Sequence, residues 1–383
     1  MSWSSKRRGQ LSPAEDSFSG VRSDSMMKIC IIGGGNVGTL MAAEFSSKGE
    51  EVWVYTSGAA IWASGLTVTD NENNVVIADA RVMATDDLAA AVEGAAYIFV
   101  TYPTYLLADL CRRLLPLVEP GQRVGLVPGA CGELFLHPVA DSGAILFGLQ
   151  RVHSVARLET RGKRVKMLGR KPSVSIAAIP ASAAPSIADD LSRLFEMPCA
   201  VLPNYLALTL TPSNPILHTS RIRTMFAGWH EGISYSRNFL FYEEWTDSAS
   251  ELMLDCDGEL QALCAHLPLD LSSVKPLTEH YESPNVQAMT WKLSHIPAFK
   301  GMRSPMKRVS TGGWVPDFSS RYFRADFDYG LRAIRSICHL SGLPCPNIDS
   351  VVEWYESVSH ERSKFVLPWS SADEMVDFYR AGQ

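Results

Sequence analysis

The chain has 383 residues, of which 46% are hydrophobic and 20% charged, and its formal net charge is -6 at pH 7. A chain of this length and composition can bury two cores of ordinary size, so we expect two domains. The negative charge argues against nucleic-acid binding and against a membrane-surface role, since both need a clustered basic face. No apolar run approaches the ~18 residues of a membrane-spanning helix.

Eight cysteines are scattered along the chain without a C-x-x-C pair. This spacing is typical of proteins of the reducing cytoplasm, and it predicts a cytoplasmic location and no metal site. The first 27 residues are rich in serine and charge and contain no apolar signal segment. We therefore expect residues 1–27 to form a disordered tail.

The segment from Lys28 to Gly38 reads KICIIGGGNVG. A short β-branched run stops at three glycines, and a helical pattern with small residues follows it up to Gly49. The glycines form a G-x-G-x-x-G between a strand and a helix, which is the context of a dinucleotide-binding loop; a glycine-rich turn in another α/β protein is the alternative. The first glycine permits the turn, the second lets the backbone approach a pyrophosphate, and the third lets helix and strand pack closely. The residues expected to contact the cofactor here are Gly33, Gly35, Asn36, Val37 and Gly38.

The second strand, Glu51 to Tyr55, ends where a dinucleotide-binding domain reads the adenosine ribose. NAD enzymes usually place Asp or Glu there, but this chain continues with Thr56, Ser57 and Gly58. No carboxylate is present to repel a 2′-phosphate, and no arginine follows the strand either. We expect Thr56 and Ser57 to bind the cofactor and favour NADP, with NAD as the alternative.

Alternating strands and helices continue as far as residue 204. The expected strands are 66–69, 74–77, 97–101, 123–127, 146–149, 154–159, 165–168, 174–179 and 199–202, and the expected helices are 86–93, 104–118 and 184–195. We expect the strands between 146 and 179 to complete one sheet. The loops after the strands 97–101 and 123–127 should form the nicotinamide side of the site, through Thr101, Tyr102 and Pro103 and through Pro128, Gly129 and Gly132.

The domain organisation follows from this change of pattern. Residues 28–204 are predicted to form a Rossmann-type α/β dinucleotide-binding domain. From 205 to 383 the long periodic segments, such as 246–267 and 328–340, are helical, so we expect an all-α C-terminal domain. Two such domains would enclose a substrate cleft between them.

Two segments of the helical part carry candidate catalytic residues. In Thr211–Arg221, Asn214 suits a helix N-cap, and His218 follows in the first turn. A histidine that only caps or packs is the alternative. In Pro316–Leu331, a turn-like segment rich in Arg and Asp, Arg321 could bind a carboxylate with its planar fork and Asp326 could fix the tautomer of a histidine. A solvated salt-bridge cluster is the alternative for that segment.

The motifs N-P-I-L-H-T and S-R-Y-F-R-A-D-F-D-Y-G-L, behind the N-terminal G-G-G-N-V-G, resemble those of the octopine/nopaline dehydrogenase family, over nearly all of the chain from Lys28 onward. The resemblance implies an enzyme that joins an α-keto acid to the amino group of an amino acid through an imine and reduces it with NAD(P)H. It further implies that His218 transfers the proton, that Asp326 is its partner and that Arg321 grips a substrate carboxylate; we place Asn214 with Arg321 at the substrate.

The sequence departs from the family pattern R-Y-x-x-E-D-x-P-Y-G-L at two positions. Ala325 replaces the acidic residue and Asp328 replaces the proline. The arginine and aspartate positions are kept, so the difference bears on which amino acid is used. We expect small-molecule substrates and neither nucleic acid nor a membrane as partner; a homodimer is compatible with the sequence but not specified by it.

Two other functions are consistent with the sequence. A reductase of a simple 2-keto acid, similar to ketopantoate reductase, also pairs a Rossmann domain with a helical one, and it would need no amine. A non-catalytic nicotinamide-nucleotide sensor would leave His218, Arg321 and Asp326 without a role.

Overall fold

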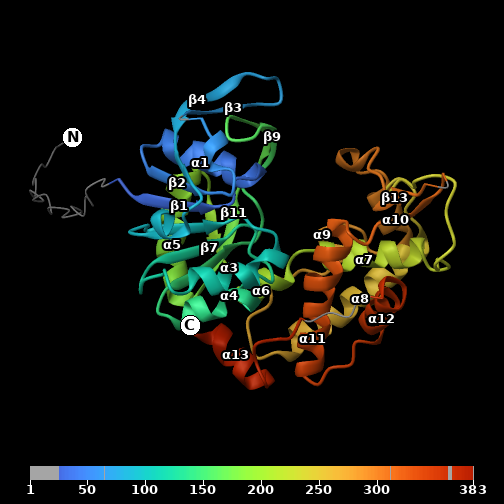
Figure 1. Ribbon diagram of the computed structural model, residues 1–383. Coiled ribbons are helices and arrows are strands. Elements are labelled where there is room, and N and C mark those ends of the chain that lie inside the picture. The colour runs from blue at the N-terminus through green and yellow to red at the C-terminus, as the bar shows by residue number, and fades with distance from the viewer. Residues whose placement is uncertain (1–25, 64, 311, 361–364, 383) are drawn as a thin grey trace, which may run out of the picture.

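The computed structural model describes residues 26–63, 65–310, 312–360 and 365–382. These residues form a lobe built on a β-sheet and a second, mostly helical lobe (Figure 1). All of the predicted tail except Met26 and Met27 lies outside the described residues. Among the described residues, no helix is both long and apolar enough to cross a membrane.

The first lobe is organised around an eight-stranded sheet with the order β12-β11-β8-β7-β6-β1-β2-β5. Its strands are β1 (Lys28–Ile32), β2 (Glu51–Tyr55), β5 (Met83–Thr85), β6 (Tyr97–Val100), β7 (Arg123–Leu126), β8 (Ile145–Leu149), β11 (Val174–Ile179) and β12 (Cys199–Val201). All neighbours from β5 to β8 pair in parallel, whereas β11 is antiparallel to β8. Counted along the chain, the six parallel strands have the Rossmann order 3-2-1-4-5-6. The order reverses between β1 and β6, where such sheets bind ligands at the carboxyl ends of their strands.

Helices cover both faces of this sheet because its strands are buried on both sides. They are α1 (Asn36–Ser47), α2 (Leu88–Val92), α3 (Leu107–Leu114), α4 (Glu133–Asp141) and α5 (Ala184–Phe195), with the short 3₁₀ turns η1 (Ala59–Ile61), η2 (Thr104–Leu106) and η3 (Ala181–Ala183). On one face, the rings of Phe45, Phe99, Phe147 and Phe195 pack together and join α1 and α5 to the sheet. Helix α4 was not predicted; it is the crossover that makes β7 and β8 parallel.

A second sheet, with four strands in the order β4-β3-β10-β9, lies beside α1 (Figure 1). Its strands are β3 (Gly65–Thr69), β4 (Val75–Arg81), β9 (Ser154–Thr160) and β10 (Arg164–Arg170). The prediction that 154–159 and 165–168 complete the main sheet is therefore wrong. Val68 and Val165 pair in register and are both fully buried, whereas many of their neighbours are exposed. This alternation belongs to a sheet that covers a helix with one face, not to a central strand.

The second lobe is helical except for one short hairpin. The elements that follow residue 204 are α6 (Tyr205–Leu210), α7 (Asn214–Met225), α8 (Asp247–His266), α9 (Leu277–His280), α10 (Val286–Ser294), η4 (Pro297–Phe299), β13 (Met306–Arg308), β14 (Trp314–Pro316), the π-helix η5 (Tyr322–Leu331), α11 (Arg332–Leu340), α12 (Pro346–Ser359) and α13 (Ala372–Arg380). Of these, α6 and α13 pack against the first lobe. The helix predicted over 246–267 is confirmed by α8. The helix predicted over 328–340 begins earlier, since η5 runs directly into α11. The hairpin β13–β14 was not predicted.

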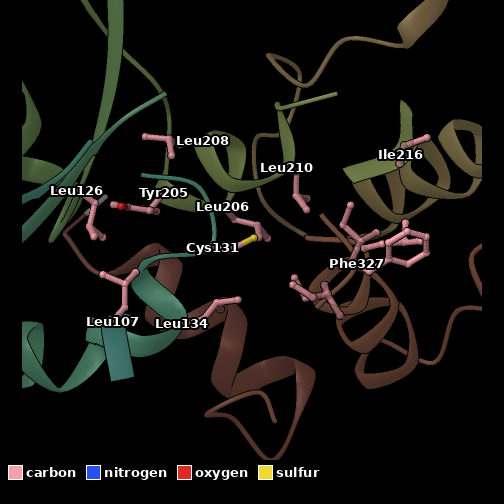
Figure 2. Close-up of a cluster of buried hydrophobic side chains, with 14 of the residues drawn as sticks. Leu107, Leu126, Cys131, Leu134, Tyr205, Leu206, Leu208, Leu210, Ile216 and Phe327 are labelled. Atoms are coloured by element: carbon pink, nitrogen blue, oxygen red, sulfur yellow. The ribbon is translucent and has the colours of Figure 1, made fainter. Parts of the chain in front are cut away.

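The two lobes share a hydrophobic core. Helix α6 carries Leu206 and Leu210 from the first lobe toward Ile216 and Phe327 of the second, as Figure 2 shows, and all four are buried. Helix α13 returns to the first lobe, where the Tyr379 hydroxyl donates a hydrogen bond of 2.9 Å to the buried Glu133. These contacts fix the start of α7 relative to the sheet.

Candidate active site

The loop between β1 and α1 has the geometry of a phosphate-binding turn. Gly33 has φ +122°, and a Cβ there would lie 2.4 Å from the Thr101 hydroxyl oxygen. A Cβ on Gly38 would lie 1.9 Å from the Gly33 carbonyl oxygen, whereas one on Gly35 would meet nothing within 4 Å. The protein itself thus requires Gly33 and Gly38, while Gly35 borders open space at the start of a helix. That is where a pyrophosphate would need close backbone approach, so this loop fits a dinucleotide.

The other residues predicted to contact the cofactor around this loop also make structural contacts. The Asn36 side chain accepts a hydrogen bond of 2.8 Å from the Leu158 amide of the second sheet, and Val37 is half-buried against that side of the core. The Thr101 hydroxyl lies 3.2 Å from the carbonyl oxygens of both Ile32 and Gly33 and so stabilises the glycine turn.

The two loops predicted to form the nicotinamide side of the site differ in position. The Tyr102 ring lies against Gly33 and so borders the glycine loop, and Pro103 starts η2. The loop at Gly129 is instead enclosed by the lobe junction, because its carbonyl accepts a hydrogen bond of 3.1 Å from the Tyr205 hydroxyl of α6. Pro128 and Gly132 belong to that same loop.

At the end of β2, Thr56 is buried and Ser57 is exposed. The primary sequence places no arginine after this strand, but the fold brings one there. Arg161, in the turn between β9 and β10, has its Nη2 atom 3.4 Å from the Thr56 hydroxyl. The expectation that no arginine serves this position is therefore corrected; the residue lies 105 positions away and has no signature in the local sequence.

Helix α7 presents His218 to the π-helix of the same lobe. The His218 Nδ1 atom is 2.8 Å from Asp326 Oδ2, although 108 positions separate the two residues. Their side chains are only 8% and 16% exposed.

Ser213, not Asn214, is the N-cap of α7, so the capping role predicted for Asn214 is wrong. Asn214 is exposed one turn before His218, on the same side of the helix.

The π-helix is what brings Asp326 to this position. A Cβ on Gly330 would lie 2.8 Å from the Pro215 ring, so the glycine lets η5 approach the first turn of α7 closely. The segment predicted to be turn-like is thus a wide helical turn, a feature that often marks functional sites. Asp328 faces Arg332, with its Oδ1 atom 3.4 Å from that guanidinium, and belongs to a separate ion-pair group.

Tyr242 completes the surroundings of the histidine and was missed in the sequence. Its hydroxyl lies 2.9 Å from His218 Nε2. Burial raises the pKa of the Tyr242 phenol, so it stays protonated at neutral pH and can donate to the ring nitrogen. With Nδ1–H donating to Asp326, the network assigns the lone pair of a neutral ring to Nε2. A histidine held in this way can exchange a proton at Nε2.

Aromatic rings surround this pair and keep water away from it. The rings of Tyr322 and Phe241 lie 4.6 and 5.5 Å from the His218 ring, centroid to centroid. In such a weakly polar site, the attraction between an imidazolium and a carboxylate is stronger than in water. The only feature of the sequence that pointed to these aromatic surroundings was the run of aromatic residues around 239–245.

Arg321 lies at the N-cap of the π-helix and is exposed. Its charge is close enough to affect the phenols of Tyr242 and Tyr322, whose pKa values it lowers against the larger effect of burial. Among the described residues no carboxylate lies within ion-pair distance of it, so the salt-bridge cluster considered for this arginine is not formed. Arg324 instead stacks on Tyr105 of the first lobe, 4.5 Å from the ring centre, and joins the two lobes.

One group in the described part of the chain has the geometry of a metal site, although none was predicted. Ligand atoms of His339, Cys345 and Asp349 lie within 4.8 Å of one another. The Asp349 carboxylate is already bound by Arg335 Nε at 2.6 Å and by His339 at 3.0 Å. These ion pairs account for the positions of His339 and Asp349.

Comparison with known families distinguishes the two lobes. Residues 201–359 match the family model described as "NAD/NADP octopine/nopaline dehydrogenase, alpha-helical domain", and residues 29–132 match that of ketopantoate reductase PanE/ApbA. The helical lobe of this chain thus matches the octopine/nopaline dehydrogenase family. The resemblance found in the sequence is thereby confirmed, as is the combination of a Rossmann-type domain with a helical one.

Relatives and solved structures agree with this assignment. An uncharacterised protein of Sinorhizobium fredii is 28% identical over 86% of this chain and 94% of its own length. Tauropine dehydrogenase of Arabella iricolor is 24% identical over 87% of this chain and 91% of its own length. The fold is similar to that of an octopine dehydrogenase solved with NADH and L-arginine, with a TM-score of 0.80 and 21% identity over 94% of this chain and 98% of that one. The chain is thus similar, over most of its length, to oxidoreductases of the opine and tauropine dehydrogenase type.

Proposed function

We propose that this protein is an opine dehydrogenase that joins an α-keto acid to the amino group of an amino acid with NAD(P)H, or runs the reverse oxidation. The observation that carries the proposal is the His218–Asp326 pair, buried among aromatic rings, together with the exposed guanidinium of Arg321 in the same lobe, for which the described residues provide no ion-pair partner. An α-keto acid offers a carboxylate to the arginine and a carbonyl oxygen to the proton donor. A nucleotide sensor would need neither group.

The cofactor would be held by the loop at Gly33–Gly38 and by the end of β2. The open position at Gly35 supports this fit, as do the amide groups at the N-terminus of α1. When bound, the nicotinamide supplies the hydride. The protein's own contribution is to bind the two substrates, exclude water and move protons.

The proton chemistry is assigned to His218. The amine attacks the keto carbon, its two protons pass to the keto oxygen, and that oxygen leaves as water, giving an imine; addition of a hydride and of a proton from solvent then gives a secondary amine. His218 takes up each proton of the attacking amine in turn at Nε2 and returns it to the departing oxygen. Asp326 holds Nδ1–H and stabilises the imidazolium, while the Tyr242 hydroxyl holds Nε2 in position until the substrate arrives.

Arg321 would bind the keto-acid carboxylate in a bidentate manner. Asn214, exposed on the same side of α7 as His218, would offer its amide to a second polar group of the substrates. Arg324 and Tyr105 lie at the boundary of the lobes, where closure would exclude water from the imine.

The alternative is reduction of a simple 2-keto acid, and the match of residues 29–132 to ketopantoate reductase favours it. That match covers only the nucleotide-binding part, whereas the helical part carries His218, Asp326 and Arg321. The two functions differ in their need for an amine.

The test is a screen of keto-acid and amino-acid pairs, monitored by oxidation of NADPH and NADH. We expect oxidation only when both substrates are present. A rate that is the same with the keto acid alone would favour the simple reductase and overturn the proposal.

A further inference from the structure

We propose that Arg161 is the residue that recognises the 2′-phosphate of NADP, reaching the cofactor site from the second sheet. This inference rests on the proposed function only in that a nicotinamide dinucleotide binds at the glycine loop. It concerns which dinucleotide is preferred, and it assigns this choice to a segment outside the Rossmann strands and helices.

The turn that carries Arg161 is fixed against the end of the cofactor site. The Ala63 amide donates a hydrogen bond of 2.9 Å to the Gly162 carbonyl, which ties the β2–β3 connection to the β9–β10 turn. Gly162 has φ +67°, and a Cβ there would lie 2.9 Å from both Cα and Cγ of Trp62. These contacts hold the turn against Trp62 and Ala63, and Arg161 is the first residue of the turn.

The guanidinium of Arg161 lies over the residues that follow β2. It is 3.4 Å from the Thr56 hydroxyl, and a Cβ on Gly58 would lie 3.3 to 3.7 Å from the guanidinium atoms. Arg161 therefore contacts both neighbours of Ser57, at the strand end where Rossmann domains read the ribose 2′ position.

Arg161 is also available for a ligand. It is exposed, and among the described residues no carboxylate lies within ion-pair distance of it. Arg164 of the same hairpin differs, since its Nε atom is 3.1 Å from Glu159. A cation that faces a site without a counter-charge attracts an anion, and a guanidinium can bind a phosphate through two parallel hydrogen bonds.

Trp62 connects this arginine with the glycine loop. A Cβ on Gly34 would lie 2.6 Å from the edge of the Trp62 ring, and the other side of the ring touches Gly162. Its Nε1–H is buried and has no hydrogen-bond partner in the described structure. The indole thus lies between the pyrophosphate loop and Arg161, at the adenosine end of the site. No acidic residue is present at Thr56–Gly58 to oppose a phosphate.

The experiment compares two nucleotides that differ only in the 2′-phosphate, 2′,5′-ADP and 5′-AMP, by titration calorimetry on the full chain. A charge-assisted bidentate contact predicts that 2′,5′-ADP binds about 10- to 100-fold more tightly than 5′-AMP. In Arg161→Ala the ratio should fall to about one, and in Arg161→Lys, which keeps the charge but not the fork, it should lie between. Arg164→Ala, a matched loss of charge on the same hairpin, should leave the ratio unchanged.

The same variants should be titrated with NADPH and NADH by cofactor fluorescence. Arg161→Ala should weaken NADPH binding by the same factor and leave NADH binding near wild type, which also shows that the variant is folded. A wild-type ratio near one, or a ratio that Arg161→Ala does not lower, overturns the inference. Amine-dependent reduction would survive that result. Failure of both dinucleotides to bind would overturn the proposed function as well.

Discussion

Removal of Asp326 should slow the reaction only while His218 is present. The structure sets the size of the effect: a hydrogen bond of 2.8 Å between side chains that are 8% and 16% exposed. A charge-assisted hydrogen bond of this kind is worth about 1.5–3 kcal/mol, which corresponds to a loss of roughly 10- to 100-fold in kcat for Asp326→Ala. His218→Ala, which removes the proton carrier itself, should lose about 100- to 10,000-fold.

The double variant decides whether the two residues act as one unit. If Asp326 acts only through the histidine, the double variant should be as slow as His218→Ala alone. The assay is kcat from NADPH oxidation at saturating substrates, with cofactor Kd measured by fluorescence. Cofactor Kd should stay near wild type, because neither residue lies at the glycine loop. Losses that multiply in the double variant would refute the pairing.

Three further predictions concern the cofactor, the substrate and stability. Ser57→Asp should shift the preference from NADPH toward NADH, because its carboxylate would repel a 2′-phosphate and pair with Arg161; an unchanged ratio of the two Kd values would contradict this. Arg321→Lys should raise KM for the keto acid more than Kd for the cofactor, since an ammonium cannot reproduce the planar fork, and unchanged keto-acid kinetics would remove the residue from the site. Burial raises the pKa of Glu133 to about 7, well above its ordinary value. The folded protein therefore binds a proton that the unfolded chain releases at lower pH, so the free energy of unfolding should fall between about pH 4.5 and 7. Urea unfolding of Glu133→Gln should show a smaller fall over that interval, and equal slopes would contradict the buried-carboxyl account.

Residues close in sequence were predictable because local chemistry determines their arrangement. The strand before Gly33 is buried and β-branched, and Gly38 can be nothing larger because its Cβ would meet the Gly33 carbonyl. The same holds for α8, whose apolar spacing and Thr246 cap mark both its type and its start. Each of these features can be recognised from a short segment of the sequence.

Features that depend on distant pairing were not predictable in this way. The strands β9 and β10 have the same local pattern whether they join the main sheet or a second one, and only the pairing of β10 with β3 decides it. Arg161 and Tyr242 each reach their sites through such tertiary contacts. His218 and Asp326 could be connected in advance only because their motifs resemble a known family, since spacing alone does not show that two residues 108 positions apart are in contact.

The most direct test of the central claim is the fate of a labelled hydride. The reaction is run with the keto acid, the amino acid and reduced cofactor that carries deuterium at the transferred position, and the products are identified by mass spectrometry. An opine dehydrogenase should give a secondary amine that contains the carbon skeletons of both substrates and carries the deuterium on the former keto carbon. A deuterated 2-hydroxy acid, with the amino acid recovered unchanged, would contradict the account.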